Sequence, residues 1–180
     1  MSVSTQLQQA LQTHIDKHQA QFNSNPMAYI DPESQSPAAI SGTEQGDQIQ
    51  WQTYVRDDKA TLCDLAKALE VEFPAQLEQL FCSVYSGNLP AQIDGHGVEL
   101  LLPWNEEDFV RLQQNITGHV LMKRRLKQQD TVFIGLTEQD DLLLTVRLND
   151  GAVCLEYVGK EPHHVLAENI SALLDAIEVS

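Results

Sequence analysis

The sequence predicts an α+β fold in which a mainly antiparallel sheet is covered by helices. Segments with helical and strand-like apolar spacing follow one another without regular β-α-β alternation. Asn149-Asp150-Gly151 is a tight-turn signal between two strand-like segments, as expected for antiparallel neighbours. With 180 residues, 42% of them hydrophobic, the chain can bury one core without disulfides or metals. We therefore expect a single domain over residues 1–180.

The N-terminal segment is expected to form an amphipathic helix over residues 4–22. Its apolar residues recur at helical spacing: Leu7, Leu11, Ile15 and Phe22. Residues 23–47 are rich in Asn, Ser, Gly and Asp and include three prolines, Pro26, Pro32 and Pro37. This composition indicates an irregular connection. The α+β core should then occupy residues 48–180.

One strand, two helices and a hairpin are predicted next. Residues 47–55 alternate well enough for a strand, and residues 60–69 have helical spacing. Pro74 suits the first turn of a further helix, which Gly87 would end. Residues 91–94 and 98–102 then predict a hairpin whose turn is Gly95-His96-Gly97.

A long helix should follow Asn105, which is a favourable N-cap. Its first turn carries three carboxylates, where the helix dipole favours negative charge: Glu106, Glu107 and Asp108. Its last turn is basic. Within the helix, Gly118-His119 predicts a closely packed neighbour, because a mid-helix glycine costs about 1 kcal/mol. Strands are predicted at 131–136, 142–148 and 153–158, and a closing helix at 164–177.

The three cysteines, Cys63, Cys82 and Cys154, form no C-x-x-C pair, and each has apolar neighbours. We expect reduced, buried thiols and hence a reducing compartment. The N-terminus lacks the basic start and apolar core of a secretory signal, and no apolar stretch is long enough to span a membrane. A cytoplasmic location follows as an expectation.

Catalytic and metal-binding motifs are absent from the sequence. His14 and His18 share a helix face but lack a third ligand, and the glycines beside His96 fit a plain turn. The abundant carboxylates include no pair with a distinctive spacing. We expect no enzyme activity, no metal and no cofactor; a hydrolase using His96 is the enzyme alternative.

The formal net charge is −15, from 26 Asp and Glu against 11 Lys and Arg. Residues 1–110 hold 16 of the acidic and 4 of the basic side chains. This balance disfavours nucleic acid, because phosphate contacts require cations. It favours a basic protein partner, although an acidic surface also serves solubility. The basic run is either a solvated helix end or a lipid contact: Lys123, Arg124, Arg125 and Lys127.

The segment from Trp104 to Leu136 has the sequence WNEEDFVRLQQNITGHVLMKRRLKQQDTVFIGL. Its features are Trp104, the acidic group with Phe109, Gln114-Asn115, Gly118-His119, Arg125-Leu126-Lys127 and Thr131-Val-Phe-Ile134. This pattern resembles the signature region of the Syd family of SecY-interacting proteins. More weakly, Phe73-Pro74, Leu80 and Gly87 resemble the opening motif of the SUKH superfamily, an α+β interaction fold.

The resemblance implies a SUKH-like domain that docks peripherally on the cytoplasmic side of the inner membrane through SecY, the translocase channel subunit. It implies an electronegative surface that receives basic cytosolic loops of SecY, and a role in monitoring or interfering with improperly assembled translocase. It supplies no catalytic residue.

We expect acidic contributors to this surface in the long helix and the preceding hairpin. They are Glu106, Glu107, Asp108, Asp94 and Glu99. For each of them, helix capping or solvation is the alternative explanation. The alternative function is a SUKH-type immunity protein that neutralises a toxin domain, because the same acidity would serve it.

Overall fold

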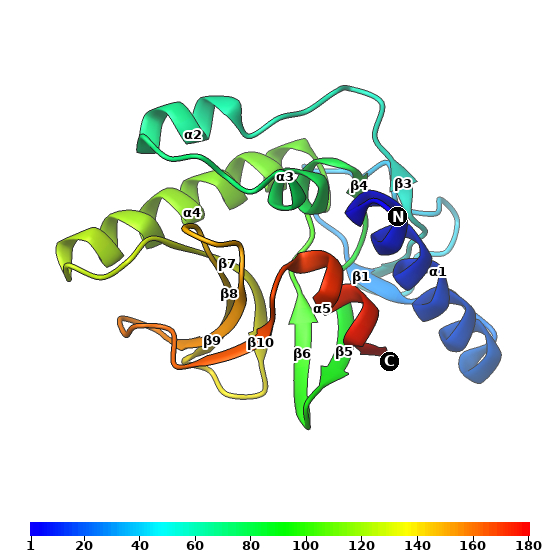
Figure 1. The fold of residues 1–180 in the computed structure, drawn as a ribbon. Helices are drawn as coiled ribbons and strands as arrows, with labels where there is room; N and C mark the ends of the chain where they lie inside the picture. The colour runs from blue at the N-terminus through cyan, green and yellow to red at the C-terminus, as the bar shows by residue number, and fades with distance from the viewer.

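A curled antiparallel sheet of seven strands forms the centre of the computed structural model, which describes residues 1–180 (Figure 1). From one edge to the other the strands are β10 (His164–Ala167), β9 (Val153–Tyr157), β8 (Leu142–Arg147), β7 (Thr131–Thr137), β6 (His96–Leu100), β5 (Leu89–Ile93) and β11 (Glu178–Val179). Two small antiparallel sheets pair β1 (Met27–Tyr29) with β2 (Gln48–Gln50) and β3 (Tyr54–Val55) with β4 (Val84–Tyr85). The predicted α+β class is confirmed.

The chain has five helices: α1 (Val3–Phe22), α2 (Cys63–Leu69), α3 (Ala75–Cys82), α4 (Glu106–Arg125) and α5 (Ile170–Ala176). Helix α4 packs along β7 and also contacts α2. Helices α1, α3 and α5 pack on one another, and α1 also contacts β5 and β11 (Figure 1). Apolar side chains from all five helices and from the large sheet join one buried cluster.

Asn105 is the N-cap of α4, as predicted. Its Oδ1 accepts a hydrogen bond from Asp108 N at 2.9 Å, which satisfies one of the free amides of the first turn. Its Nδ2 donates to Ser34 O at 3.1 Å, and the residue is only 4% exposed. The cap therefore also fixes part of the 23–47 connection against α4.

That connection is more ordered than its composition suggests. It contains β1, which pairs with β2, and it buries Ala38 completely. The strand expected at 47–55 is instead two short strands, β2 and β3. Residues 48–50 pair with β1, whereas residues 54–55 pair with β4. Such changes of partner depend on distant segments and have no local sequence signal.

The hairpin between β5 and β6 turns one residue earlier than expected. Ile93 pairs with His96, so the turn consists of Asp94 and Gly95, both with positive φ. Asp-Gly is a favoured pair for a type I′ turn, whose twist matches the flanking strands. The prediction that His96 lies in the turn is wrong; it is the first residue of β6.

The closing helix is also shorter than expected. Residues 164–167 form the edge strand β10, and α5 begins only after Asn169, whose Oδ1 accepts from Ala172 N at 2.8 Å. The apolar spacing suits either state locally, and pairing with β9 selects the strand. Helix α3 likewise ends at Cys82, before Gly87, because residues 84–85 pair with β3.

The cysteine prediction holds for two residues of three. Cys82 and Cys154 are buried, and burial raises the pKa of both thiols, that of Cys82 to about 12. Cys63 is exposed, contrary to expectation, because the first turn of α2 directs it to solvent while Leu65 and Leu69 face the core.

Candidate protein-binding cleft

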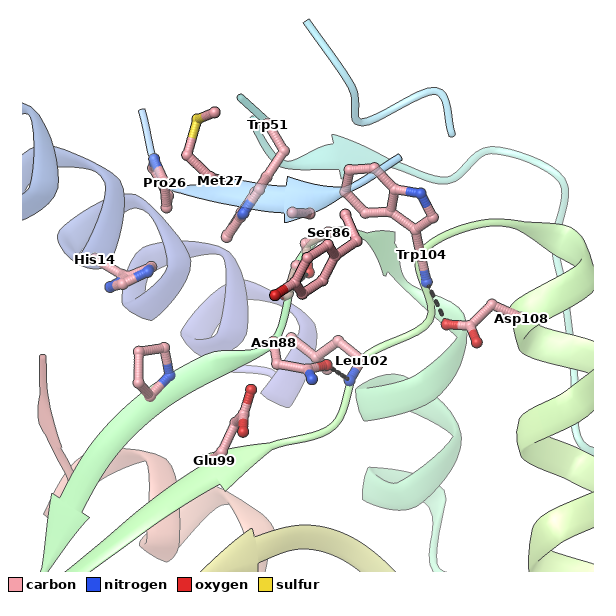
Figure 2. A pocket seen from close by; sticks show the side chains of 14 residues that line it. His14, Pro26, Met27, Trp51, Ser86, Asn88, Glu99, Leu102, Trp104 and Asp108 are labelled. Carbon is pink, nitrogen blue, oxygen red and sulfur yellow. Dashed lines mark hydrogen bonds between the residues drawn. The ribbon is translucent and has the colours of Figure 1, made fainter. Parts of the chain in front are cut away.

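A cavity of about 470 Å³, hereafter the cleft, lies between α1, β1, β6 and the start of α4 (Figure 2). Three aromatic residues line it, Tyr29, Trp51 and Trp104, together with two carboxylates, Glu99 and Asp108. Its lining contains no lysine or arginine. The volume is within the usual range of ligand sites, about 300–1,000 Å³. The cleft therefore combines negative charge with aromatic surface.

Trp51 is the most buried aromatic residue of the cleft, with 2% exposure. Its main-chain N–H donates to Pro26 O at 3.0 Å, and its main-chain carbonyl accepts from Asn25 Nδ2 at 2.9 Å. Gly87 provides the space for the indole, because a Cβ atom there would be 2.5 Å from Trp51 Nε1. No group of the chain accepts a hydrogen bond from this indole N–H, which borders the cleft (Figure 2).

Glu99 reaches the cleft from β6 (Figure 2). Its neighbours Val98 and Leu100 are buried while Glu99 is exposed, as the alternation of a strand requires. The Glu99 carboxylate has no hydrogen-bond or ion-pair partner within the chain. Asp108, in the first turn of α4, accepts a hydrogen bond from Trp104 N through Oδ2 at 2.8 Å. Its Oδ1 lies 3.8 Å from Arg111 Nε.

The five acidic residues singled out in the sequence do not form one group. Glu99 and Asp108 line the cleft, whereas Glu106, Glu107 and Asp94 do not. Glu106 accepts from Tyr85 Oη at 2.8 Å, and Glu107 accepts from the hydroxyl of Ser34. Asp94 is at the exposed tip of the β5–β6 hairpin. Adjacent residues on a helix point in different directions, which separates Asp108 from the two glutamates.

Arg56 neutralises part of the acidic surface near Glu106. Its side chain is 2% exposed, and its guanidinium lies 4.3 Å from the ring centre of Tyr85 and 4.6 Å from that of Phe109. Nη2 is 2.7 Å from Asp58 Oδ2 and 3.6 Å from Glu106 Oε2. No local sequence pattern indicates this buried arginine, because its partners come from three separate segments.

Two further carboxylates, Asp31 and Glu44, line a neighbouring cavity of about 170 Å³ that shares Trp104 with the cleft. Both belong to the 23–47 connection and were not predicted as site residues. Their irregular surroundings offer no periodic pattern from which their orientation could be inferred. Carboxylates therefore line both of the cavities that Trp104 borders.

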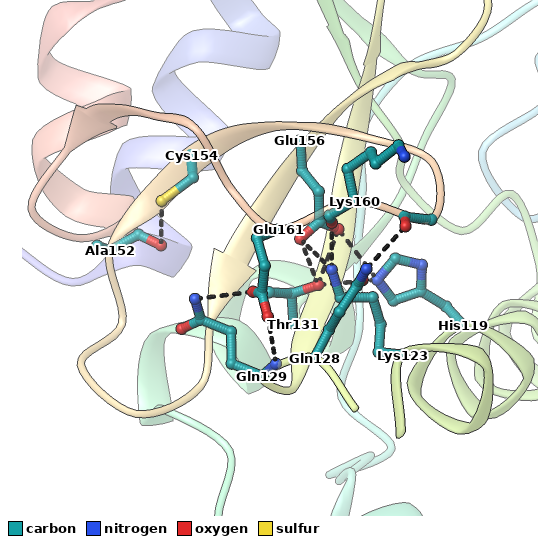
Figure 3. Close-up of polar contacts among 11 residues, drawn as sticks. His119, Lys123, Gln128, Gln129, Thr131, Ala152, Cys154, Glu156, Lys160 and Glu161 are labelled. Atoms are coloured by element: carbon teal, nitrogen blue, oxygen red, sulfur yellow. Dashed lines mark hydrogen bonds and ion pairs between the residues drawn. The ribbon is translucent and has the colours of Figure 1, made fainter. Parts of the chain in front are cut away.

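The basic run at the end of α4 is not uniformly exposed, and the proposed lipid contact of Lys123 is wrong. Lys123 is fully buried, and its Nζ lies 2.9 Å from Glu156 Oε1, itself fully buried on β9 (Figure 3). Arg124 is partly exposed but is held by Asp130 at 2.9 Å and by Leu69 O at 2.7 Å. The helix end packs on the sheet, which draws Lys123 inward.

The Glu156 carboxylate belongs to a larger group of buried polar side chains. Thr131 Oγ1 lies 3.0 and 2.9 Å from the two Glu156 oxygens, and His119 Nε2 lies 2.9 Å from that hydroxyl (Figure 3). Burial alone would raise the pKa of Glu156, but hydrogen bonds from His119, Lys123 and Thr131 lower it below its ordinary value. The glutamate is thus held as a carboxylate.

Acid is expected to weaken the fold through Glu156. Because its pKa is lowered on folding, its contribution to stability is complete above the ordinary value of 4.5 and is lost as the pH falls through the lowered value. Urea unfolding of the wild type should therefore show a larger decrease in free energy between pH 6 and pH 3 than unfolding of Glu156→Gln. Equal decreases would contradict the prediction.

The remaining candidates do not assemble into a metal site. No group of three or more His, Cys, Asp and Glu side chains is arranged to hold a metal ion. His14 Nδ1 instead lies 2.6 Å from Ser180 O, and His18 Nδ1 lies 2.8 Å from Ser24 O. None of the helices combines the length and apolar content needed to cross a membrane.

Comparison with known proteins connects this chain to one family. The family model described as Syd protein (SUKH-2) matches residues 4–178. A Protein Syd of Pseudoalteromonas translucida is 54% identical over 179 residues, which cover 99% of this chain and all of the relative. A Protein Syd of Idiomarina loihiensis is 40% identical over 92% of both chains, and one of Yersinia pseudotuberculosis is 31% identical over 98% of this chain and 96% of the relative. This chain belongs to the Syd family.

Proposed function

We propose that this protein binds SecY and that the cleft receives a positively charged cytosolic segment of that channel subunit. One observation carries the proposal: Glu99 and Asp108 line an open cavity that contains no lysine or arginine. Membership of the Syd family supports SecY as the partner, and the acidic lining supports a basic segment as the part that is bound.

The charge distribution supports electrostatic docking. Residues 1–110 contain 16 acidic and 4 basic side chains, and one of the four, Arg56, is buried in ion pairs. Glu107 and Asp94 do not line the cleft but are exposed, so they add to the negative potential around it. Such a potential accelerates the encounter with a positive partner and makes affinity depend on salt.

In this role the protein acts by binding alone. It associates peripherally with the cytoplasmic side of the inner membrane when SecY loops are accessible, and it thereby monitors or interferes with improperly assembled translocase. Loops that are covered in an assembled translocase would not reach the cleft. Binding should therefore be strongest to SecY whose basic loops are free.

Charge reversal in the cleft should weaken binding to SecYEG in lipid nanodiscs. For Glu99→Lys we expect a Kd about tenfold higher than that of the wild type, because an attraction becomes a repulsion in a confined site. Raising the salt from 50 to 300 mM should weaken wild-type binding as well, since exposed charges are screened. Fluorescence titration at both salt concentrations measures the two effects.

Asp140→Lys is the matched control, because Asp140 is exposed, lies outside the cleft and undergoes the same change of charge. Its Kd should change by less than about threefold, as expected for a distant screened charge. If Glu99→Lys and the control behave alike, or if salt has no effect, the cleft is not the SecY site.

Any contact with anionic lipid should involve Arg125 and Lys127, which remain exposed at the end of α4. The 20-residue helix separates them from the acidic first turn by about 30 Å. Arg125→Ala/Lys127→Ala should reduce co-sedimentation with phosphatidylglycerol vesicles and leave affinity for SecYEG in neutral nanodiscs unchanged. Undiminished co-sedimentation would remove the lipid contact.

A further inference from the structure

We infer that the cleft is an arginine-selective subsite, which receives an arginine side chain and the adjoining main chain of a basic polypeptide segment. The inference rests on the proposed function, because it names the residue type that the basic segment must present. It depends on three features of the cleft: the unpaired carboxylate of Glu99, aromatic surface, and an indole N–H of Trp51 that borders the cleft and has no acceptor in the chain.

The carboxylates of the cleft can be neutralised by a cation from outside the chain. Glu99 makes no ion pair, and Asp108 uses Oδ2 to accept from Trp104 N. Arg111 approaches Asp108 Oδ1 at 3.8 Å but is itself 61% exposed and does not line the cleft. A guanidinium entering between these carboxylates would form charge-assisted hydrogen bonds in a partly desolvated site.

The aromatic lining favours arginine over lysine. A guanidinium is planar, stacks on aromatic rings and donates in its own plane to carboxylates, whereas an ammonium is a compact, strongly hydrated charge. The chain uses this chemistry elsewhere: Arg56 lies over Tyr85 and Phe109 while Asp58 accepts from its edge. The cleft offers aromatic rings beside carboxylates in the same way, without an arginine of its own.

The third feature indicates a polypeptide rather than a small cation. Trp51 is 98% buried, and its indole N–H has no acceptor in the chain although it borders the cleft (Figure 2). Asn88 accepts from Leu102 N through Oδ1 at 3.0 Å, which leaves its Nδ2 available as a second donor in the cleft. Main-chain carbonyls beside the arginine would accept from these donors. A polyamine has cations but no such acceptors.

The full-length ¹⁵N-labelled protein provides a direct test, because its only two tryptophans, Trp51 and Trp104, both line the cleft. The probes are two nine-residue Gly/Ser peptides, one with three arginines and one with three lysines, and spermidine. The arginine peptide should shift both indole N–H signals and bind about fivefold more tightly than the lysine peptide. Spermidine should leave the Trp51 N–H signal in place. Equal affinities of the two peptides, or unmoved indole signals, would overturn the inference.

Three variants assign the effect to the cleft. Trp104→Leu should abolish the preference for arginine while retaining the weaker lysine affinity, and Glu99→Gln should weaken both peptides. Asp140→Asn, which removes one charge outside the cleft, should leave both affinities unchanged. If Trp104→Leu does not fold, the indole shifts of the wild type still decide the question.

The two proposals fail in different ways. Salt-dependent binding to SecYEG without any preference between the peptides would overturn the arginine subsite and leave the proposed function intact. Selective binding of the arginine peptide at the indoles, with no binding to SecYEG, would support the subsite and overturn SecY as the partner.

Discussion

Replacing Lys123 by methionine is expected to lower the free energy of unfolding by about 3–5 kcal/mol, because removing one member of a buried ion pair leaves the other charge uncompensated. Lys123 and Glu156 are both fully buried, with 2.9 Å between Nζ and Oε1. Without the lysine, Glu156 would retain Thr131 and His119 but lose its cation. Urea unfolding followed by tryptophan fluorescence measures the loss.

Arg125→Met is the matched control, because it removes a cation from the same helix turn at an exposed position. Its effect should stay within about 0.5 kcal/mol. The double variant Lys123→Met/Glu156→Met should recover much of the stability lost in the single one, since apolar side chains can replace a buried pair. A cost below about 1 kcal/mol for Lys123→Met would show that the pair is not buried as described.

Replacing Gly87 by alanine should destabilise the protein by about 1–3 kcal/mol, because the added methyl group overlaps a packed side chain. Its Cβ would lie 2.5 Å from both Nε1 and Cε2 of Trp51, which is 2% exposed and cannot move freely. The indole must therefore shift toward the cleft. We expect a lower urea midpoint and an altered indole N–H chemical shift of Trp51.

Gly118→Ala makes the same chemical change where space is available. No atom lies within 4 Å of a Cβ at Gly118, inside α4. Alanine there should stabilise the protein by about 0.4–1 kcal/mol, because it reduces the freedom of the unfolded chain and suits a helix. Effects of the same sign for the two substitutions would contradict the packing around Trp51.

Gly118-His119 illustrates why tertiary contacts could be predicted from the sequence only in part. The sequence correctly indicated a close neighbour at this position, but the contact belongs to His119, which reaches Thr131, and not to Gly118. Likewise, the acidic first turn of α4 was correctly located, but only one of its three carboxylates lines the cleft. Helical periodicity gives relative directions around a helix and does not say which neighbour lies on each side.

The sequence by itself determined the features that depend on neighbouring residues. The Asn105 cap, the spacing of α1 and α4 and the central run of β7, β8 and β9 follow from local hydrogen bonding and apolar period. The resemblance in residues 104–136 identified the family without reference to the fold.

Tertiary structure alone decided everything that joins distant segments. It made residues 164–167 a strand, paired Lys123 with Glu156 across 33 positions, and brought Trp51, Glu99 and Asp108 into one cleft. The tertiary structure thus shows where two of the many acidic residues of the sequence come together. The physical reason is that strand pairing, burial and ion pairing depend on how all segments of the chain pack together. No local pattern contains that information.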